Sequence, residues 1–399
     1  MLGKQVRLFR LMGFDVRIHA SWLVIAALVT WSFATQVFGM KQCFNPAVCW
    51  TLGVLGTAGL FLSVVLHEMC HSLVARKYGL PMKGITLFIF GGVAELDEEP
   101  PSPKVEFLMA IAGPVSSVVL GGVFYGTAAL VGAIHATPEV EGLLGLLGMV
   151  NLVLAGFNMI PGFPLDGGRV LRSALWAWKG RNPKSPGVLG DPSLRWATRI
   201  ASETGSAFGF VLIVWGILDV LMGGPVQGLW MFLIGLFIRF AAKQGYQQVL
   251  VRGLLVGEPI RRLMNPNVVT VEAALPLKSF VEDFVYKYHY KVFPVLRDGD
   301  VAGVATTRSL RDVPQEQWGT NTVANILESC SPSNTLSPAA DAMAALAVMN
   351  RTDTETLVVV EAGQLVGVLT MKDLMKFMTL KLELESEHVD QSLHLPNGS

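Results

Sequence analysis

The chain has 399 residues, of which 51% are hydrophobic and only 16% are charged, and its mean hydropathy is +0.48. Soluble domains carry about a quarter charged residues, so this composition excludes an ordinary soluble protein and predicts a membrane protein. Lys+Arg and Asp+Glu are equal at 31 each. Net charge therefore gives no sign of a nucleic-acid partner, and we expect none.

Six apolar runs are close to the ~20 residues that a membrane-spanning helix needs. They are Trp22–Phe38, Val48–Val74, Phe107–Ile134, Leu143–Met159, Phe208–Met222 and Val226–Ala242. The last two are short and are separated only by Gly223-Gly224-Pro225, so they form either a helical hairpin or a single irregular element. No small-residue cleavage site follows the first run, and we expect that run to be retained.

Lysine and arginine gather in alternate loops. The N-terminal arm and the segments after the second, fourth and sixth runs are basic, whereas the other loops hold Lys41, Glu139 and Glu141 or no charge. Basic loops face the cytoplasm, so we expect both termini there. Cys43 and Cys49 share one of the other loops and form either a disulfide, on an oxidising side, or two reduced thiols.

The second apolar run contains His67-Glu68-Met69-Cys70-His71. Two histidines four residues apart lie on one face of a helix, where one Zn²⁺ can take both imidazoles. The glutamate between them can act as a general base. Because such groups are costly in hydrocarbon unless they bind something or react, a chance motif is a poor explanation.

A catalytic zinc needs a third protein ligand and an open position. The strongest candidate is Asp166, which follows the fourth run in the segment Asn158-Met159-Ile160-Pro161-Gly162-Phe163-Pro164-Leu165-Asp166-Gly167-Gly168. Two prolines and three glycines exclude a regular helix here, so the chain can turn the aspartate back toward the histidines. Spacing alone equally allows Asp166 to be the N-cap of a helix from Gly167 to Trp178.

Residues 83–95, between the second and third runs, are rich in β-formers, too short to span a membrane, and hold Gly91-Gly92 in their second half. We expect a β-hairpin at membrane level, with its backbone against protein or an aqueous cavity. Its edge could accept an extended peptide by strand addition. The alternative is a simple interfacial loop.

From Val256 onward the chain has the character of a soluble protein and contains a repeat. Both copies have the order β-α-β-β-α, and the equivalent glycines Gly303 and Gly367 are 64 residues apart (367 − 303). We expect a transmembrane domain over 1–245, a linker over 246–257, two repeats over 258–318 and 319–379, and a flexible tail over 380–399. The predicted fold class is therefore a polytopic α-helical membrane protein, of about six transmembrane helices and a membrane-level β-hairpin, followed by a cytosolic α/β tandem.

Three features together resemble the site-2 protease family of intramembrane zinc metalloproteases, over roughly residues 1–245. They are His67-Glu68-x-x-His71 in one transmembrane run, Asn158-x-x-Pro161-x-x-Pro164-x-Asp166-Gly167 after a later one, and the hairpin with Gly91-Gly92. The resemblance implies that His67, His71 and Asp166 are the ligands of one Zn²⁺. It also implies that Glu68 is the catalytic base and that Asn158 lies near the substrate carbonyl or its oxyanion.

The repeat resembles a pair of cystathionine-β-synthase (CBS) domains, which some archaeal and bacterial members of that family carry. Such pairs bind adenosine-containing ligands such as ATP in the clefts between repeats. Thr370 and Asp373 match the ribose-binding pattern. The first copy keeps Thr306 but has Ser309 in place of the acidic residue, while Arg308 could contact phosphate. The alternative is a dimerisation module that binds no ligand.

The resemblance implies a zinc metalloprotease that hydrolyses a peptide bond within or near a transmembrane segment of a substrate such as a membrane-anchored regulator, with an adenine nucleotide as regulatory ligand. We expect an integral protein of the plasma membrane of an archaeon or bacterium and a homodimer formed through the CBS pair. One rival is a transporter or channel with a CBS tail, although no inverted repeat is visible. The other is an inactive metal-binding scaffold, which the intact Glu68 disfavours.

Overall fold

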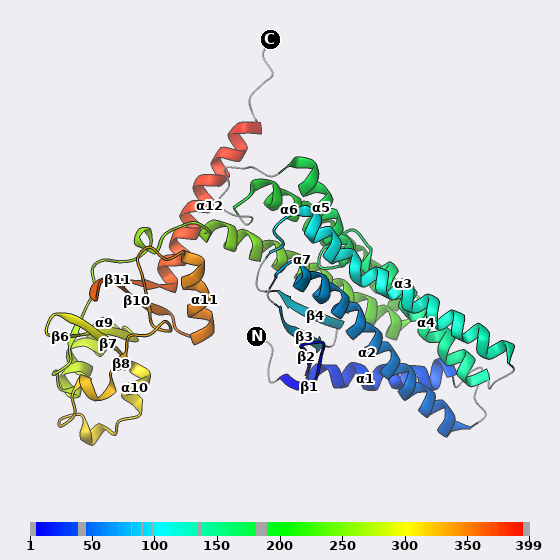
Figure 1. Ribbon diagram of the computed structural model, residues 1–399, viewed down its shortest axis with the longest axis horizontal. Coiled ribbons are helices and arrows are strands. Elements are labelled where there is room, and N and C mark those ends of the chain that lie inside the picture. The colour runs from blue at the N-terminus through cyan, green and yellow to red at the C-terminus, as the bar shows by residue number, and fades with distance from the viewer. Residues whose placement is uncertain are drawn as a thin grey trace, which may run out of the picture. The chain divides into compact units, whose positions relative to one another are not determined.

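The computed structural model describes residues 5–38, 45–80, 82–88, 91–96, 99–134, 138–180 and 190–393. The chain divides into two compact units, Met1–Val249 and Leu250–Ser399. Long helices and one small sheet make up the first, and the second is a mixture of short strands and helices (Figure 1). Cys43 lies outside the described residues, and so does its proposed pairing with Cys49.

Five of the described helices are long and apolar enough to cross a membrane. They are α2 (Pro46–Lys77), α3 (Pro103–Ala133), α4 (Pro138–Asn158), α6 (Pro192–Leu221) and α7 (Pro225–Leu255). The first apolar run is a shorter helix, α1 (Ser21–Ser32), which continues as the π-helical η1 (Phe33–Phe38). The polytopic helical fold is confirmed, and the expected six spans become five long helices and one short apolar helix.

Three of the long helices begin with the same sequence signal, a polar residue followed by proline. Asn45, Ser102 and Asp191 are the N-caps of α2, α3 and α6, and the side chain of each accepts a hydrogen bond from a backbone N–H of the first turn. Proline at the first helical position has no N–H to leave unsatisfied and its φ already suits a helix. These caps define where the membrane helices start.

The fifth and sixth apolar runs form a helical hairpin rather than one irregular element. Gly223, in the turn, has φ of +97°, a conformation that glycine adopts without strain. Gly209 and Gly216 of α6 face the backbone of α7 at Gly235 and Gly228, so closely that a Cβ on any of the four would collide with the backbone of the opposite helix. Small residues permit such close helix packing within a membrane.

One four-stranded sheet lies within the membrane unit, in the order β1 (Gln5–Leu11), β2 (Phe14–His19), β3 (Met82–Phe88) and β4 (Gly91–Leu96). Strands β3 and β4 pair antiparallel, as predicted for this segment, which excludes the interfacial loop. The N-terminal arm was expected only to be basic, but it forms the antiparallel β1–β2 hairpin, and β2 pairs parallel with β3. The sheet satisfies backbone groups that hydrocarbon could not.

The second unit contains the predicted β-α-β-β-α order twice. The first copy comprises β5 (Val271–Glu272), the helical segments α8 (Leu277–Ser279), η3 (Phe280–Val285) and α9 (Tyr286–Tyr288), β6 (Val292–Arg297), β7 (Asp300–Thr306) and α10 (Thr307–Arg311). The second comprises β9 (Thr335–Leu336), α11 (Ala342–Thr352), β10 (Thr356–Glu361), β11 (Gln364–Thr370) and α12 (Met371–Leu393). Strand register repeats as well, since Val295 opposes Gly303 and Val359 opposes Gly367.

Helices extend into both the expected linker and the expected flexible tail. The expected linker continues α7 as far as Leu255, which is fully buried in the core of the second repeat. Residues 380–393, expected to be a flexible tail, belong to α12. Lys381 anchors this helix, because its Nζ donates to the carbonyl of Leu254 and to Glu258. Residues 394–399 lie outside the described part of the chain.

Candidate metal centre

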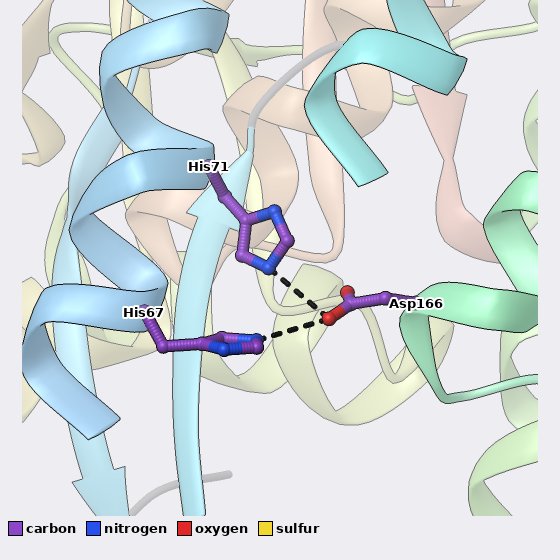
Figure 2. Close-up of side chains that lie close together, drawn as sticks. All are labelled: His67, His71 and Asp166. Atoms are coloured by element: carbon purple, nitrogen blue, oxygen red, sulfur yellow. Dashed lines mark hydrogen bonds and ion pairs between the residues drawn. The ribbon is translucent and has the colours of Figure 1, made fainter. Parts of the chain in front are cut away.

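Three side chains converge where α2 meets the start of α5 (Asp166–Lys179). Asp166 Oδ2 lies 3.0 Å from His67 Nε2 and 3.2 Å from His71 Nε2. Figure 2 shows the aspartate pointing toward both imidazoles. One donor atom from each residue lies within 4.8 Å of the others. Both histidines are buried, at 2% and 6% exposure. The structure thus brings together three residues that were predicted from separate parts of the sequence.

The donor set and its spacing fit zinc. With Zn–N and Zn–O bonds of about 2.0–2.1 Å at tetrahedral angles, two ligand atoms lie roughly 3.3 Å apart. The two distances from Asp166 to the histidines, 3.0 and 3.2 Å, are close to this value. Space for an ion comes from Gly113 of α3, because a Cβ at that position would fall on Nε2 of both histidines. Two imidazoles and one carboxylate also leave a position open, which is the arrangement of catalytic zinc sites.

Helix α3 orients both imidazoles. His71 Nδ1 donates to the backbone carbonyl of Met109 at 2.6 Å, and His67 Nδ1 lies 2.9 Å from Ser117 Oγ. A carbonyl only accepts hydrogen bonds, so the proton of neutral His71 is on Nδ1 and the lone pair of Nε2 points toward Asp166. The sequence interpretation missed these supporting groups. Small and polar residues within an apolar helix, such as Gly113 and Ser117, were the available signal.

Asp166 does not act as the helix cap. Leu165 is the N-cap of α5, without a side-chain capping bond, and Asp166 occupies the first helical position with its carboxylate toward the histidines. The reason is the tight packing that follows it. A Cβ on Gly167 would collide with the backbone of Met159, and one on Gly168 with that of Gly162. The two glycines allow the chain to turn back on itself and present the aspartate.

Glu68 and Asn158 border one cavity beside the three converging side chains. The cavity has a volume of about 250 Å³ and is also lined by His67. Its remaining wall is largely apolar and includes Trp230 and Phe237 of α7. Asn158, the last residue of α4, donates one amide hydrogen to the carbonyl of Leu154 at 3.1 Å. The predicted base and the predicted amide thus share a cavity with a candidate ligand.

The four predicted nucleotide-binding residues divide into two pairs. Thr306 and Arg308 line a cavity of about 840 Å³ in the second unit. Thr370 and Asp373 are not among its lining residues. They instead bond to each other, because Asp373 Oδ2 accepts from Thr370 Oγ1 at 2.6 Å and from Thr370 N at 3.0 Å. The structure therefore places each pair within its own repeat and does not bring all four together.

Buried charge also occurs next to the metal centre, in α5. Burial lowers the pKa of Arg172, but the adjacent carboxylates of Glu106 and Glu99 outweigh this and hold the pKa above its ordinary value. The guanidinium therefore stays charged, as arginine does in proteins generally. Sequence interpretation counted Arg172 only among the basic residues after the fourth run and assigned no role to Glu99 or Glu106.

Comparison with known proteins agrees with this geometry. Residues 55–135 and 133–188 match peptidase family M50, and residues 260–316 and 324–380 match the CBS domain. The protein Rip3 of Mycobacterium tuberculosis is 32% identical over 94% of this chain and 92% of its own length. Zinc metalloprotease MJ0392 of Methanocaldococcus jannaschii is 30% identical over 98% of this chain and 100% of its own.

One solved structure, a site-2 protease from Methanocaldococcus jannaschii, is 32% identical and covers 61% of this chain and 95% of that chain, with a TM-score of 0.40. The identity of 30% to 32% with MJ0392 and Rip3, over nearly the full length of each, is the stronger finding, because it includes the membrane-spanning unit and the repeats together. The chain belongs to peptidase family M50, the site-2 protease family of zinc metalloproteases, and carries a pair of CBS domains after its membrane unit.

Proposed function

We propose that the chain hydrolyses a peptide bond within or near a transmembrane segment of a membrane-protein substrate, such as a membrane-anchored regulator. The observation that carries this proposal is the convergence of His67, His71 and Asp166 beside Glu68, at the wall of a largely apolar cavity. Membership of a metalloprotease family argues against the transporter or channel, and the presence of Glu68 in the cavity argues against an inactive scaffold.

Each residue has a role that follows from its position. His67, His71 and Asp166 would hold Zn²⁺, which when bound supplies the positive charge that polarises the scissile carbonyl and acidifies water. Glu68 takes the proton of the attacking water and passes it to the leaving amine. Asn158 keeps one amide hydrogen beyond its bond to Leu154, and this hydrogen can stabilise the carbonyl oxygen as negative charge develops.

The substrate must present an extended backbone, because a helix hides its carbonyls in internal hydrogen bonds. Strand β4 offers a place for it. Among the described strands β4 is last in the sheet, so one of its edges is open, and Gly92 packs directly against the side chain of Glu68. A substrate segment added to this edge would pass beside Glu68. The apolar wall formed by Trp230 and Phe237 suits side chains from a transmembrane segment.

The variant Glu68→Gln tests the proposed reaction. An amide cannot accept a proton from water, so we expect cleavage of a reconstituted membrane substrate to fall by about 10²–10⁴-fold or more. Zinc content should remain at the wild-type level, since Glu68 is not a ligand. Glu203→Gln is the matched control, because Glu203 is an exposed residue that pairs with Arg199 on the surface of α6. Wild-type turnover in Glu68→Gln would refute the mechanism.

We infer an integral protein of the plasma membrane, with both termini on the cytoplasmic side. The support is the concentration of lysine and arginine in alternate loops and the five long apolar helices. In intact cells an impermeant reagent should then label a cysteine introduced at Glu139, and it should label one introduced at exposed Asp283 only after the cells are opened. Labelling of both from outside would contradict this topology.

We also propose a homodimer formed through the CBS pair. Helix α12 exposes Met375, Leu380 and Leu384, at 58%, 49% and 66%, and exposed apolar side chains favour a protein partner. The mass of the detergent-solubilised protein, measured by light scattering, should equal two chains. Substitution of the three residues by serine should give a single chain, and a monomeric wild type would refute this assembly.

A nucleotide is the proposed ligand of the cleft in the second unit. The cavity of about 840 Å³ is lined by residues of both repeats and by the cationic side chains of Lys291, Arg308 and Arg311. Three cations around one polar cavity favour a phosphate-bearing ligand. Lys291 also pairs with Glu355 of the second repeat at 2.9 Å, so a ligand that attracts Lys291 would alter a contact between the repeats.

Each repeat places a carboxylate beside its threonine hydroxyl. In the second copy Asp373 accepts from Thr370. In the first copy, where Ser309 stands in the acidic position, the carboxylate comes from Glu328 of strand β8 (Glu328–Ser329). Its Oε1 accepts from Ser309 Oγ at 2.6 Å and from Thr306 Oγ1 at 3.2 Å. A carboxylate in either place can accept both hydrogens of a ribose diol.

Nucleotide binding can be tested by calorimetry on the full chain in detergent, with ATP, ADP and AMP. We expect Glu328→Gln and Asp373→Ala each to weaken binding, while Glu361→Gln, which removes an exposed partner of Arg261, should not. Absence of binding by all three nucleotides would leave the CBS pair as a dimerisation module.

Regulation would pass through α7. This helix lines the cavity beside Glu68 at Trp230 and continues to Leu255, which is buried in the core of the second repeat. A nucleotide that prefers one packing of the repeats would bias α7 by as much as that preference allows. Cleavage should therefore change rate when nucleotide saturates the protein, and an unchanged rate with nucleotide bound would refute the coupling.

A further inference from the structure

A cluster of three charged side chains lies buried beside the metal centre. Arg172 of α5 donates from Nε to Glu106 Oε1 of α3 at 2.5 Å, and from Nη2 to Glu99 Oε2 at 2.9 Å. The side chains of Arg172 and Glu106 are 2% and 1% exposed, and that of Glu99 is 17% exposed. The guanidinium also lies over the ring of Phe163, 5.2 Å from its centroid.

Stability alone is a poor reason for this cluster. Removing two carboxylates and a guanidinium from water costs about as much as their attraction returns, and apolar residues of similar volume often do as well. What an arginine fork provides is direction, because its planar donors meet a carboxylate in only a few geometries. The cluster is therefore suited to setting the position of one helix against another.

Helix α3 is the reference against which both histidines are held. Met109 accepts from His71, Ser117 contacts His67, and Glu106 lies one turn before Met109 on the same helix. Asp166 has no such contact with α3. It begins α5 after the irregular segment 159–165. Helix α5 packs along α3, and within that packing the bond from Arg172 to Glu106 is the directional contact between the two helices.

We propose that Arg172 is a positioning residue of the metal centre, whose fork on Glu106 fixes α5 against α3 and so holds the Asp166 carboxylate between the two imidazoles. This inference rests on the ligand roles proposed above. Of the two carboxylates that accept from Arg172, the buried Glu106 should contribute most to this positioning. Glu99, which follows β4 in the chain, is more exposed, and its loss should matter less.

The experiment is a zinc-affinity measurement on the full chain in detergent, by competition with a chelator. For Arg172→Gln we expect affinity to fall about 10–100-fold, the usual cost of losing a group that orients metal ligands. Arg172→Lys, which keeps the charge and loses the fork, should recover only part of it. Glu99→Gln should change affinity less than Glu106→Gln.

Arg199→Gln is the matched control, because Arg199 and its partner Glu203 are both 63% exposed.

A merely structural role would lower stability and leave the metal site of the folded protein intact. The double variant Arg172→Met with Glu106→Leu separates the two, because it removes the two almost fully buried charges and leaves only the more exposed Glu99, so it should fold as stably as an apolar contact allows. We expect this folded protein still to bind zinc more weakly. Its Co²⁺-loaded form should show visible absorption bands that differ from the wild-type bands, as expected for a displaced carboxylate ligand.

Wild-type zinc affinity and an unchanged Co²⁺ spectrum in the folded double variant would overturn the inference, and so would wild-type affinity in Arg172→Gln. Failure of the proposed function has a different signature. In that case the wild-type chain would bind no zinc, or Asp166→Asn would bind it as tightly as wild type, whatever happens at Arg172.

Discussion

The two units place the same kinds of charged residue in opposite environments. In the membrane unit Arg172 and Glu106 are almost completely buried, and Asp166 contacts two buried histidines. In the second unit the pair Lys291 and Glu355 is 70% and 69% exposed. Water screens the pair of Lys291 and Glu355 but not the pair of Arg172 and Glu106. Ion pairs of similar length therefore differ in how much free energy is lost when one partner is removed. Charges in the membrane unit therefore define geometry, whereas those around the cleft remain available to a ligand.

The units also differ in how their polar sites are assembled. Thr370 and Asp373 of the second unit are three residues apart, and their contact forms within one strand–helix junction. The contacts of Asp166 with His67 and His71 join residues 99 and 95 positions apart. A local site survives changes elsewhere in the fold, whereas the metal centre depends on the packing of several helices.

The largest effect is expected at Asp166. Asp166→Ala should remove zinc and cleavage together, since only two protein ligands remain. If Asp166 contributed only to the helix terminus, its loss would cost about 1 kcal/mol of stability and leave the metal bound. Metal analysis of the folded variant decides between these outcomes. Asp283→Ala, at an exposed position of the second unit, is the control.

The next effect is on stability. Arg172→Met leaves Glu106 buried without its partner and should lower the free energy of unfolding by about 3–5 kcal/mol. Unfolding in mixed micelles with increasing SDS measures it. A loss below about 1 kcal/mol, the range of exposed pairs, would remove the contrast between the units.

A smaller effect is expected at Ser117. Ser117→Ala deletes the hydrogen-bond partner of His67 Nδ1 and should weaken zinc binding by about 10–100-fold while the ligands remain. Ser116→Ala is a close control, because Ser116 Oγ donates to the backbone carbonyl of Gly113 and does not contact either histidine. Equal affinities for the two variants would show that His67 needs no such support.

The smallest effect is expected in the second unit. Lys291→Gln breaks the exposed pair with Glu355 and should change the free energy of unfolding by less than about 1 kcal/mol. The difference should shrink further at high salt, because screening already weakens exposed pairs. A cost of several kcal/mol would mean that losing one partner of this exposed pair is as destabilising as losing one partner of the buried cluster.

Much of the architecture was predictable because it depends on local patterns. The lengths of the apolar runs predicted the spanning helices, although the first proved short and partly π-helical. The repeat of glycines predicted two copies of one unit, and their strand register is the same. The two N-terminal strands were missed, because the arginines of the arm were interpreted only as basic residues and because β3, with which the hairpin pairs, lies far along the chain.

The candidate site divides in the same way. His67, Glu68 and His71 share one helix, so their spacing alone placed both imidazoles on one face. Nothing local could decide between Asp166 as a ligand and Asp166 as a cap. That choice depended on Gly167 and Gly168, which pack against the preceding turn of backbone. The structure shows that the Asp166 carboxylate faces the two histidines, and its role as a zinc ligand is the proposal to be tested.

By itself the sequence determined the membrane character, the helical spacing of the two histidines and the duplicated soluble unit, because each is a property of neighbouring residues along one element. Only the tertiary structure decided that α3 supports both histidines, that Arg172 ties α5 to α3, and that Glu328 stands beside Thr306. These contacts join segments separated along the chain. Their formation depends on how helices and strands pack, which no short window of sequence specifies.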